Sequence, residues 1–272
     1  MVFTVLSRGR SRGDGMVYKP PLSMRAYVQA LKARCEVDRN PYFTALADGS
    51  FAREDFVETQ VQFLFAVVFF SRPMAVLAGR LPRPEQRLSL LENVHDEHGE
   101  GNLSLSHERT FLTLLARLGE SPDAIERRAL WPEVRAFNTV LGGLCVGDDC
   151  YTGLAALGII EDLFSGISAR LGQGIVRQGW LRPEALVHYS THEALDVSHA
   201  DGFYKVIEGP FAAHPRHAYQ ITQGLELGAY TFLRMYEDLY RARARRWTRA
   251  VRGPHSLAEG WHLEGVPGGG VV

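Results

Sequence analysis

The feature that most constrains the fold is an almost unbroken run of helical hydrophobic periodicity. Apolar residues recur at spacings of three and four from about residue 22 to residue 248, which is typical of amphipathic helices packed around a common core. Alternating β-branched patterns with hairpin turns, and internal repeats of fixed period, are missing from the sequence. The sequence therefore predicts an all-α protein, a single bundle of about seven to eight helices over residues 21–250.

Turn-forming stretches divide this run into separate helices. The segments ADGS, GESPD, VGDD and EGPFAAHP contain the Gly, Pro, Asp and Ser residues that favour turns and helix ends. Asp149 can cap one helix, and Gly119 can close another. The predicted helices cover roughly residues 22–37, 41–48, 52–80, 83–118, 131–145, 149–176, 183–208 and 214–248.

The two ends of the chain differ from this pattern. Residues 1–20 are rich in Gly, Arg and Ser, and the chain ends in EGVPGGGVV, so we expect a flexible leader and a disordered tail over residues 251–272. The apolar run FLFAVVFF at 63–70 is far shorter than the ~20 residues of a membrane-spanning helix. No signal-peptide pattern precedes it. We therefore expect a cytoplasmic protein with no membrane partner.

Composition excludes several classes of protein. Apolar residues make up 46% of the chain and charged residues 22%, as in an ordinary globular protein. Thirty basic residues face thirty-one acidic ones, so no general electrostatic field favours nucleic acid. The three cysteines are odd in number and form no C-x-x-C pair. A disulfide framework and a thiolate zinc site are therefore not expected.

One predicted helix carries three candidate metal ligands on one face. In THEALDVSHADGFYKVIE, residues 191–208, His192, Asp196 and His199 recur at intervals of four and three. A helix turns by about 100° per residue, so these positions return to within roughly 40° of one another. Imidazole and carboxylate together suit iron, manganese or zinc. The alternative is a surface helix with three polar residues at helical spacing, and this segment alone does not decide.

A second group of ligand-type residues lies in LENVHDEHGEGNLSLSH, residues 91–107. Solubility does not require this density, although a solvated, charged helix turn is the alternative reading. Gly99 and Gly101 interrupt the predicted helix at a cost of about 1 kcal/mol each relative to alanine, which indicates a local distortion that redirects side chains. The group consists of Glu92, His95, Asp96, Glu97, His98, Glu100 and His107.

Glu161 supplies a third element of the pattern. It lies in the otherwise apolar stretch LGIIEDLFSGI, residues 157–167, where burial of a bare carboxylate would be costly. In di-metal helical bundles, facing helices contribute inward Glu and His residues, because two divalent cations about 3.5 to 4 Å apart need several anionic oxygens. The three segments together would supply six ligands and predict a site for two metal ions.

These segments resemble the haem-oxygenase-like di-iron oxidases and oxygenases, whose bundle is shared with haem oxygenase, thiaminase-like proteins and the pyrroloquinoline-quinone synthesis enzyme. The resemblance covers about residues 25–245 and rests on NVHDEHGEGNLSLSH, LGIIEDLFSGI and HEALDVSH. The last segment matches the His-x3-Asp-x2-His ligand set of the family. The resemblance implies a haem-oxygenase-like bundle with two Fe(II) ions and O2 as co-substrate. The metal ligands that it implies are Glu97, His107, Glu161, His192, Asp196 and His199.

Glu100 departs from the family pattern. Some members have a histidine three residues after the first glutamate, where this chain has Glu100. A straight helix would also align Glu100 with His107 better than it aligns Glu97. Glu100 is therefore a seventh ligand, a substitute for Glu97, or a base near the metals, and Glu97 ranks first. We take Glu97, Glu161 and Glu100 as the candidate catalytic carboxylates.

The apolar segment ETQVQFLFAVVFFSRPM predicts one wall of a substrate pocket. Phe63, Val67 and Phe70 would point inward, Gln62 could hydrogen-bond a substrate, and Arg72 could receive a carboxylate. The alternative is a core helix with a polar residue at each end. His188, His214 and His217 are expected at the surface or as caps, and RARARRWTR at 241–249 as a solvated basic helix end.

The resemblance implies an O2-activating, non-haem oxidoreductase that acts on a small metabolite in a biosynthetic pathway. Family members N-oxygenate amines, decarboxylate or fragment fatty and amino acids, or form para-aminobenzoate from their own tyrosine. We favour N-oxygenation of a small amine, because Gln62 and Arg72 are polar and no long alkyl channel is evident. Oxidative decarboxylation or C–C fragmentation is the alternative.

Two other classes remain open. One is a metal-independent enzyme of the same bundle, either thiaminase-like or cofactor-synthesising; the thiaminase-like type needs a nucleophilic cysteine, whereas Cys145 and Cys150 lie in a glycine-rich turn. The other is a non-catalytic helical interaction protein, for which a buried Glu161 has no purpose. The sequence does not decide whether an external electron donor or a homodimer is involved.

Overall fold

The computed structural model describes residues 23–249, except for the side chains of residues 190–198. These residues form ten α-helices, four short 3₁₀ turns and one π-helical turn. Within the same range there is no β-strand, and a single antiparallel bridge joins Arg128 and Thr248. The all-α prediction is confirmed. The predicted leader, 1–20, and tail, 251–272, lie outside the described residues.

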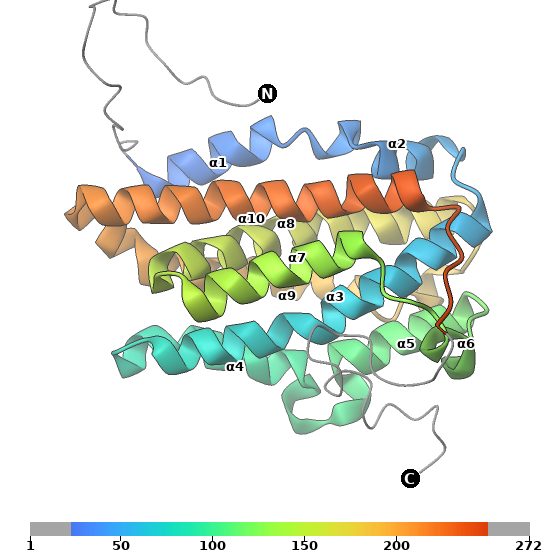
Figure 1. The fold of residues 1–272 in the computed structure, drawn as a ribbon, viewed down its shortest axis with the longest axis horizontal. Helices are drawn as coiled ribbons and strands as arrows, with labels where there is room; N and C mark the ends of the chain where they lie inside the picture. Colours follow the sequence, from blue (N-terminus) through green and yellow to red (C-terminus); the bar gives the residue numbers. More distant parts are fainter. Residues whose placement is uncertain (1–22, 250–272) are drawn as a thin grey trace, which may run out of the picture.

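The elements follow one another along the chain with short connections (Figure 1). In order they are α1 Met24–Arg34, η1 Val37–Arg39, α2 Pro41–Asp48, α3 Arg53–Arg80, α4 Pro84–Glu97, η2 Gly99–Gly101, η3 Leu103–Leu105, α5 His107–Arg117, α6 Pro122–Glu126, α7 Pro132–Gly142, η4 Gly143–Gly147, α8 Cys150–Arg177, η5 Pro183–Ala185, α9 Tyr189–Ala213 and α10 Pro215–Ala242.

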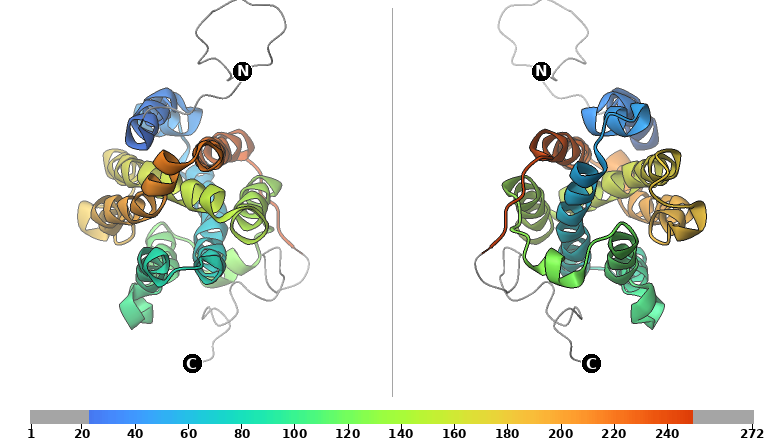
Figure 2. Two further views of the ribbon diagram at one scale, coloured as in Figure 1. Left: turned by 90° about the vertical axis from the view of Figure 1, so that its left-hand side faces the viewer. Right: turned by 90° about the vertical axis from the view of Figure 1, so that its right-hand side faces the viewer.

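Helix α8 organises the bundle. It packs along α9 and α10 and also contacts α2 and α3. Helices α1 and α2 lie on one side of this centre and α4 and α5 on the opposite side, as the views along and across the bundle show (Figures 1 and 2). A helix surrounded in this way must be apolar over most of its circumference, and α8 is buried at most positions from Thr152 to Ile175.

Two glycines of α10 allow it to approach α8 closely. A Cβ added at Gly224 would lie 2.2 Å from the carbonyl oxygen of Thr152, and one added at Gly228 would lie 2.7 Å from that of Ala156. Glycines four residues apart lie on one stripe of a helix. This stripe lets the backbones of α8 and α10 touch without an intervening side chain.

The predicted helix boundaries fail at three places, one of which is the predicted turn EGPFAAHP, where α9 continues through Pro210 to Ala213. The helix expected over 83–118 is wrong, because the chain leaves α4 at Glu97 and starts α5 at His107. The helix expected over 214–248 ends at Ala242. The division of the expected 83–118 helix into α4 and α5, together with the five-residue α6, explains why the described residues form more helices than the seven or eight predicted.

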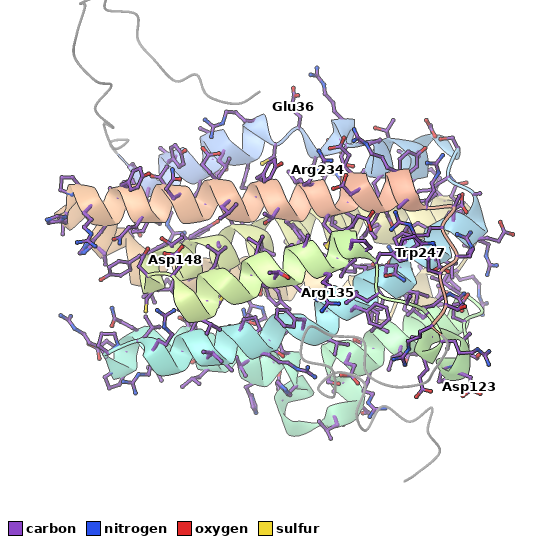
Figure 3. All side chains as sticks on the ribbon, viewed as in Figure 1. Glu36, Asp123, Arg135, Asp148, Arg234 and Trp247 are labelled. Atoms are coloured by element: carbon purple, nitrogen blue, oxygen red, sulfur yellow. The ribbon has the colours of Figure 1, made fainter. Side chains whose placement is uncertain are left out.

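The residues after α10 form an extended strap across the start of α7. The backbone amide of Ala129 donates to the carbonyl of Trp247 at 2.9 Å, and Figure 3 shows Trp247 on this strap. Nη1 of Arg245 pairs with Oε2 of Glu133 at 2.7 Å. The solvated basic helix end expected over 241–249 is therefore wrong beyond Ala242, because the helix ends there and Arg245 and Arg249 bond to the α6–α7 region.

Helix α3 alone among the described helices is long and apolar enough to cross a membrane by length and composition. However, 67% of its most apolar window is buried inside the protein. The core helix of a globular protein meets the same length and composition criterion. The burial of α3 fits a core helix of this kind.

Replacing Gly224 with alanine should destabilise the bundle. The added methyl group meets the backbone of α8, and overpacking of this kind costs about 1–3 kcal/mol, whereas the better helix propensity of alanine offsets at most about 1 kcal/mol. Urea unfolding followed by circular dichroism should show a lower midpoint. Gly79→Ala on α3, where an added Cβ meets nothing within 4 Å, should leave the midpoint unchanged or raise it. Equal midpoints for the two variants would contradict the close contact.

Candidate functional site

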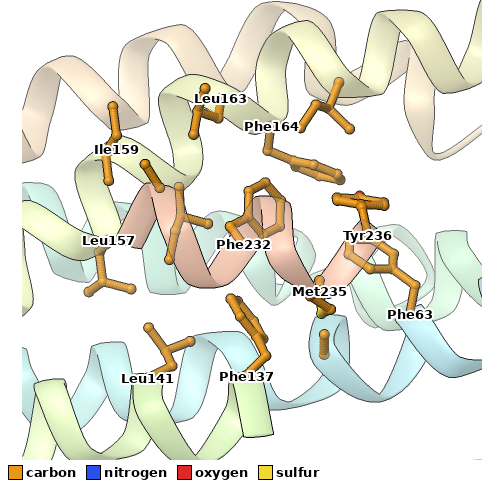
Figure 4. Close-up of a cluster of buried hydrophobic side chains, with 14 of the residues drawn as sticks. Phe63, Phe137, Leu141, Leu157, Ile159, Leu163, Phe164, Phe232, Met235 and Tyr236 are labelled. Carbon is orange, nitrogen blue, oxygen red and sulfur yellow. The ribbon is translucent and has the colours of Figure 1, made fainter. Parts of the chain in front are cut away.

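A cavity of about 40 Å³ lies between α3, α7, α8 and α10, with the end of α4 and the start of α5 at its wall. The three α3 side chains predicted to point inward are part of this wall. Figure 4 shows Phe232 between Phe164 and Phe137 in the core beside it. The apolar lining consists of Phe63, Ala66, Val67, Phe70, Phe137, Ile160, Phe164 and Phe232, and the ionisable lining consists of Glu97, His107, Glu161 and His188.

Glu97 and His107 meet because the chain turns back between α4 and α5. Gly99 has a φ of 69°, and an added Cβ at this position would lie 2.6 Å from the backbone nitrogen of Ser106. This close approach places the start of α5 against the end of α4. Nδ1 of His107 lies 2.9 Å from Oε1 of Glu97, and their side chains are only 7% and 8% exposed. The local distortion predicted at the glycines is present.

Glu100 lies outside the cavity. It is exposed and has a φ of 54° in the η2 turn, and it is not among the lining residues. A turn, and not a straight helix, sets the direction of its side chain, so the expected alignment of Glu100 with His107 is not found. The prediction of Glu100 as a catalytic carboxylate or a substitute for Glu97 is wrong in this structure.

Glu161 is buried, as its apolar neighbours in the sequence predicted. Its side chain lines the cavity from α8, and the residue is 3% exposed. Oε1 accepts a hydrogen bond from Nδ2 of Asn93 at 3.0 Å. A hydrogen bond of this kind favours the charged form of a carboxylate. Asn93 is itself fully buried on α4, so this contact ties α4 to α8 at the cavity.

His199 of α9 is also buried and faces α4. Its Nε2 lies 2.8 Å from Oδ2 of Asp96. Its Nδ1 is buried and has no hydrogen-bond partner among the described residues. His192 and Asp196, predicted on the same face of α9, lie outside the described side chains. His199 is the one residue of this predicted ligand set whose side chain is described, and it is not among the residues that line the cavity.

His188 was missed as a site residue. It is 1% exposed, its Nδ1 lies 3.0 Å from Oγ1 of Thr110, and its ring centre lies 5.9 Å from that of His107. The expectation of a surface histidine is wrong here, because the chain enters α9 through the interior. The available signal was its spacing of four residues from His192. His214 does cap α10, as expected.

Of the three predicted substrate contacts, only Phe63 lines the cavity. Nε2 of Gln62 donates to the carbonyl of Ala129 at 3.0 Å, and Oε1 accepts from the amide of Trp131 at 2.9 Å. Gln62 thus anchors the segment before α7, and its predicted substrate contact is wrong. Arg72 is not among the lining residues either, and its role as a carboxylate receptor stays a prediction.

The cysteines do not form a nucleophilic site. None of the three described thiols lines the cavity. Burial raises the pKa of the Cys145 thiol to about 12, whereas a nucleophilic cysteine needs a lowered pKa. A reaction at the cavity that depends on a thiolate therefore has no support among these residues.

The donor set at the cavity fits iron. Among the described side chains, no group of three or more His, Cys, Asp or Glu is already arranged around a common point, and this set does not include His192 and Asp196. Carboxylate and imidazole are nevertheless the donors that suit non-haem iron. Glu97, His107 and Glu161 share the cavity, and the buried Nδ1 of His199 is a nitrogen of the right type.

Comparison with known proteins identifies the family. A family model described as "Iron-containing redox enzyme" matches residues 57–233, which is more than half of the chain. The protein belongs to this family of iron-containing redox enzymes. The matched region spans α3 to most of α10 and includes all the predicted metal ligands.

Individual proteins resemble the chain at lower identity. The chain is 23% identical over 181 residues to the 4-aminobenzoate synthase of Nitrosomonas europaea, covering 62% of this chain and 72% of that protein. A domain of unknown function with a heme oxygenase-like fold from Shewanella denitrificans OS217 matches with a TM-score of 0.69 at 14% identity, covering 82% and 94% of the two chains. A TenA homologue from P. horikoshii OT3 matches with a TM-score of 0.64 at 13% identity, covering 81% and 99%. The structural matches establish the haem-oxygenase-like fold.

Replacing Gly99 with alanine should weaken iron binding by separating Glu97 from His107. Gly99 and Gly101 have φ values of 69° and 87°, so alanine at either position carries a left-handed backbone cost of about 1–2 kcal/mol. Only at Gly99 does the methyl group also clash with Ser106. Anaerobic titration of Fe(II) against a chelator should show an affinity about tenfold lower, or more, for Gly99→Ala than for Gly101→Ala. Equal affinities would show that this turn does not set the site.

Proposed function

We propose that the protein is an O2-activating, non-haem di-iron oxidase or oxygenase that acts on a small metabolite. The observation that carries the proposal is that Glu97, His107 and Glu161, from three different helices, line one apolar cavity. Membership of the iron-containing redox enzymes supports iron as the metal. The carboxylates and the imidazole are donors that suit non-haem iron, which supports a cation at this position.

The chain's own residues have distinct roles in this proposal. The phenylalanines of the cavity hold the apolar part of the substrate and exclude water. The contacts between Glu97 and His107 and between Glu161 and Asn93 orient the donor atoms in advance. Bound ferrous iron would supply the electrons that reduce O2. The residues that would hold the two Fe(II) ions are Glu97, His107, Glu161, His192, Asp196 and His199.

N-oxygenation of a small amine is the reaction that the cavity supports best. In the sequence, the polarity of Gln62 and Arg72 favoured an amine substrate, but neither residue lines the cavity. Instead, the ionisable residues that line the cavity within the described part are two acids and two histidines, with no lysine or arginine. No described side chain at the cavity could therefore pair with the carboxylate of a fatty or amino acid, which favours an amine as the substrate. The distant relative named 4-aminobenzoate synthase is compatible with a nitrogen-containing product.

A metal-independent enzyme is the second candidate. The structural likeness to TenA homologues fits this alternative at the level of the fold. A shared fold does not determine chemistry, and the described thiols lie away from the cavity. Iron content therefore separates the two candidates.

The cytoplasmic location, an external electron donor and a homodimer stay predictions.

Anaerobic reconstitution should load about two Fe(II) ions per chain. Alanine at His107, Glu161 or His199 should lower the iron content to about one ion or less, because each change removes a donor. Iron is measured by a colorimetric chelator after removal of unbound metal. Glu100→Ala is the matched control, since Glu100 is exposed, and it should keep the wild-type content. A wild-type protein without iron would favour the metal-independent alternative.

Small aryl or alkyl amines should be converted to products that carry oxygen from O2. The iron-loaded protein is incubated with a chemical reductant and isotope-labelled dioxygen, and mass spectrometry detects the label in the product. Carboxylic acids with the same carbon skeleton should not react, because no described lysine or arginine lines the cavity to bind their carboxylate. Conversion of the acids and not of the amines would instead support decarboxylation or C–C fragmentation.

A further inference from the structure

The end of α4 presents three polar side chains on one face. Asn93, Asp96 and Glu97 are separated by three and four residues, so they are neighbours on the helix surface. Each contacts a different helix: Asn93 bonds to α8, Asp96 to α9 and Glu97 to α5. Asn93 is the hydrogen-bond partner of the cavity carboxylate Glu161, and Glu97 is a predicted metal ligand. Asp96 has no role in the site so far.

The contact between Asp96 and His199 has the form of a carboxylate supporting a metal-binding histidine. Oδ2 of Asp96 lies 2.8 Å from Nε2 of His199, and the histidine side chain is 6% exposed. An ionised carboxylate only accepts hydrogen bonds, so Nε2 must carry the N–H in this contact. The lone pair of a neutral imidazole is then on Nδ1, the atom that is buried without a hydrogen-bond partner in the described structure.

We propose that Asp96 is a positioning residue that fixes the ring of His199 so that Nδ1 is its metal-binding nitrogen. Histidines that bind metals almost always donate their other N–H to a carboxylate, carbonyl or water, and this bond sets the tautomer and raises the donor strength of the ligand. The inference rests on the proposed iron site, and it assigns a function to a residue for which neither the ligand prediction nor the cavity lining gives one.

The pairing also explains why two acids stand side by side at the end of α4. Glu97 reaches His107 at the cavity, whereas Asp96 is 26% exposed at its side chain and reaches His199. Adjacent helix positions project about 100° apart, so neighbouring acids can serve two different helices. One turn of α4 thus contacts histidines from both α5 and α9.

Replacement of Asp96 by asparagine tests this role with little change in shape. An amide accepts more weakly than a carboxylate and can also donate, so it no longer enforces N–H at Nε2. We expect Co(II), used as a spectroscopic probe in place of Fe(II), to bind about 10–100-fold more weakly at one of two sites, with the other site retained. The titration is followed by Co(II) absorption and by competition with a chelator.

Two controls separate positioning from a merely structural role. Glu92→Gln removes the same charge from an exposed position on the same helix and should leave both Co(II) sites unchanged. Thermal unfolding of the metal-free protein should give the same midpoint for Asp96→Asn and Glu92→Gln. In a His199→Ala background, Asp96→Asn should change Co(II) affinity by less than about twofold, because a pair that acts as one unit is not additive.

The outcomes distinguish this inference from the proposed function. Wild-type protein that binds no Co(II) would overturn the proposed di-metal site and this inference with it. Wild-type protein with two Co(II) sites, together with Asp96→Asn that binds as tightly as Glu92→Gln, would overturn the positioning role alone. An equal loss of affinity from Asp96→Asn with and without His199 would also overturn it, since the effect would not pass through the histidine.

Discussion

The arrangement of the site depends on one backbone turn at Gly99. On a continuous helix, Glu97 and His107 would be about 15 Å apart along the axis, too far to share a metal ion. The left-handed conformation of Gly99 and its contact with the backbone of Ser106 reverse the chain within a few residues, and the two side chains come within 2.9 Å. Because α4 and α5 both pack on α3, this reversal also fixes where the two donors enter the cavity.

The second constraint is electrostatic. Glu97 and Glu161 line a cavity whose other walls are mostly phenylalanine, and burial in such surroundings disfavours a charged carboxylate. Asn93 supports Glu161 through a neutral amide, which stabilises the charge without cancelling it, and His107 carries a charge only when protonated. Divalent cations at this end of the cavity would cancel the charge of both acids. The contacts from α4 hold the donors together, so ordering them upon metal binding costs little.

The sequence predicted the helices and the inward position of Glu161 well, because both depend on local hydrophobic periodicity. It predicted a local distortion at Gly99 and Gly101 but not a complete break between α4 and α5, since the positive φ of Gly99 and its close approach to the backbone of Ser106 depend on how the two helices pack. Glu100 was predicted near His107 because a straight helix through this segment was assumed. Gln62 was misassigned because its partners lie nearly 70 residues away, and His188 because burial of a helix entry depends on tertiary packing.

The same helical bundle supports both iron-containing redox enzymes and TenA homologues, so the fold by itself does not choose the chemistry. What chooses it is the set of side chains that the bundle brings to its cavity. In this chain an acid from α4, a histidine from α5 and an acid from α8 converge there, while the described cysteines do not. Each of these donors sits on a separate element held by its own packing or hydrogen bonds. Through Glu97, Asn93 and Asp96, α4 contacts α5, α8 and α9, so the position of α4 sets where these side chains lie relative to one another.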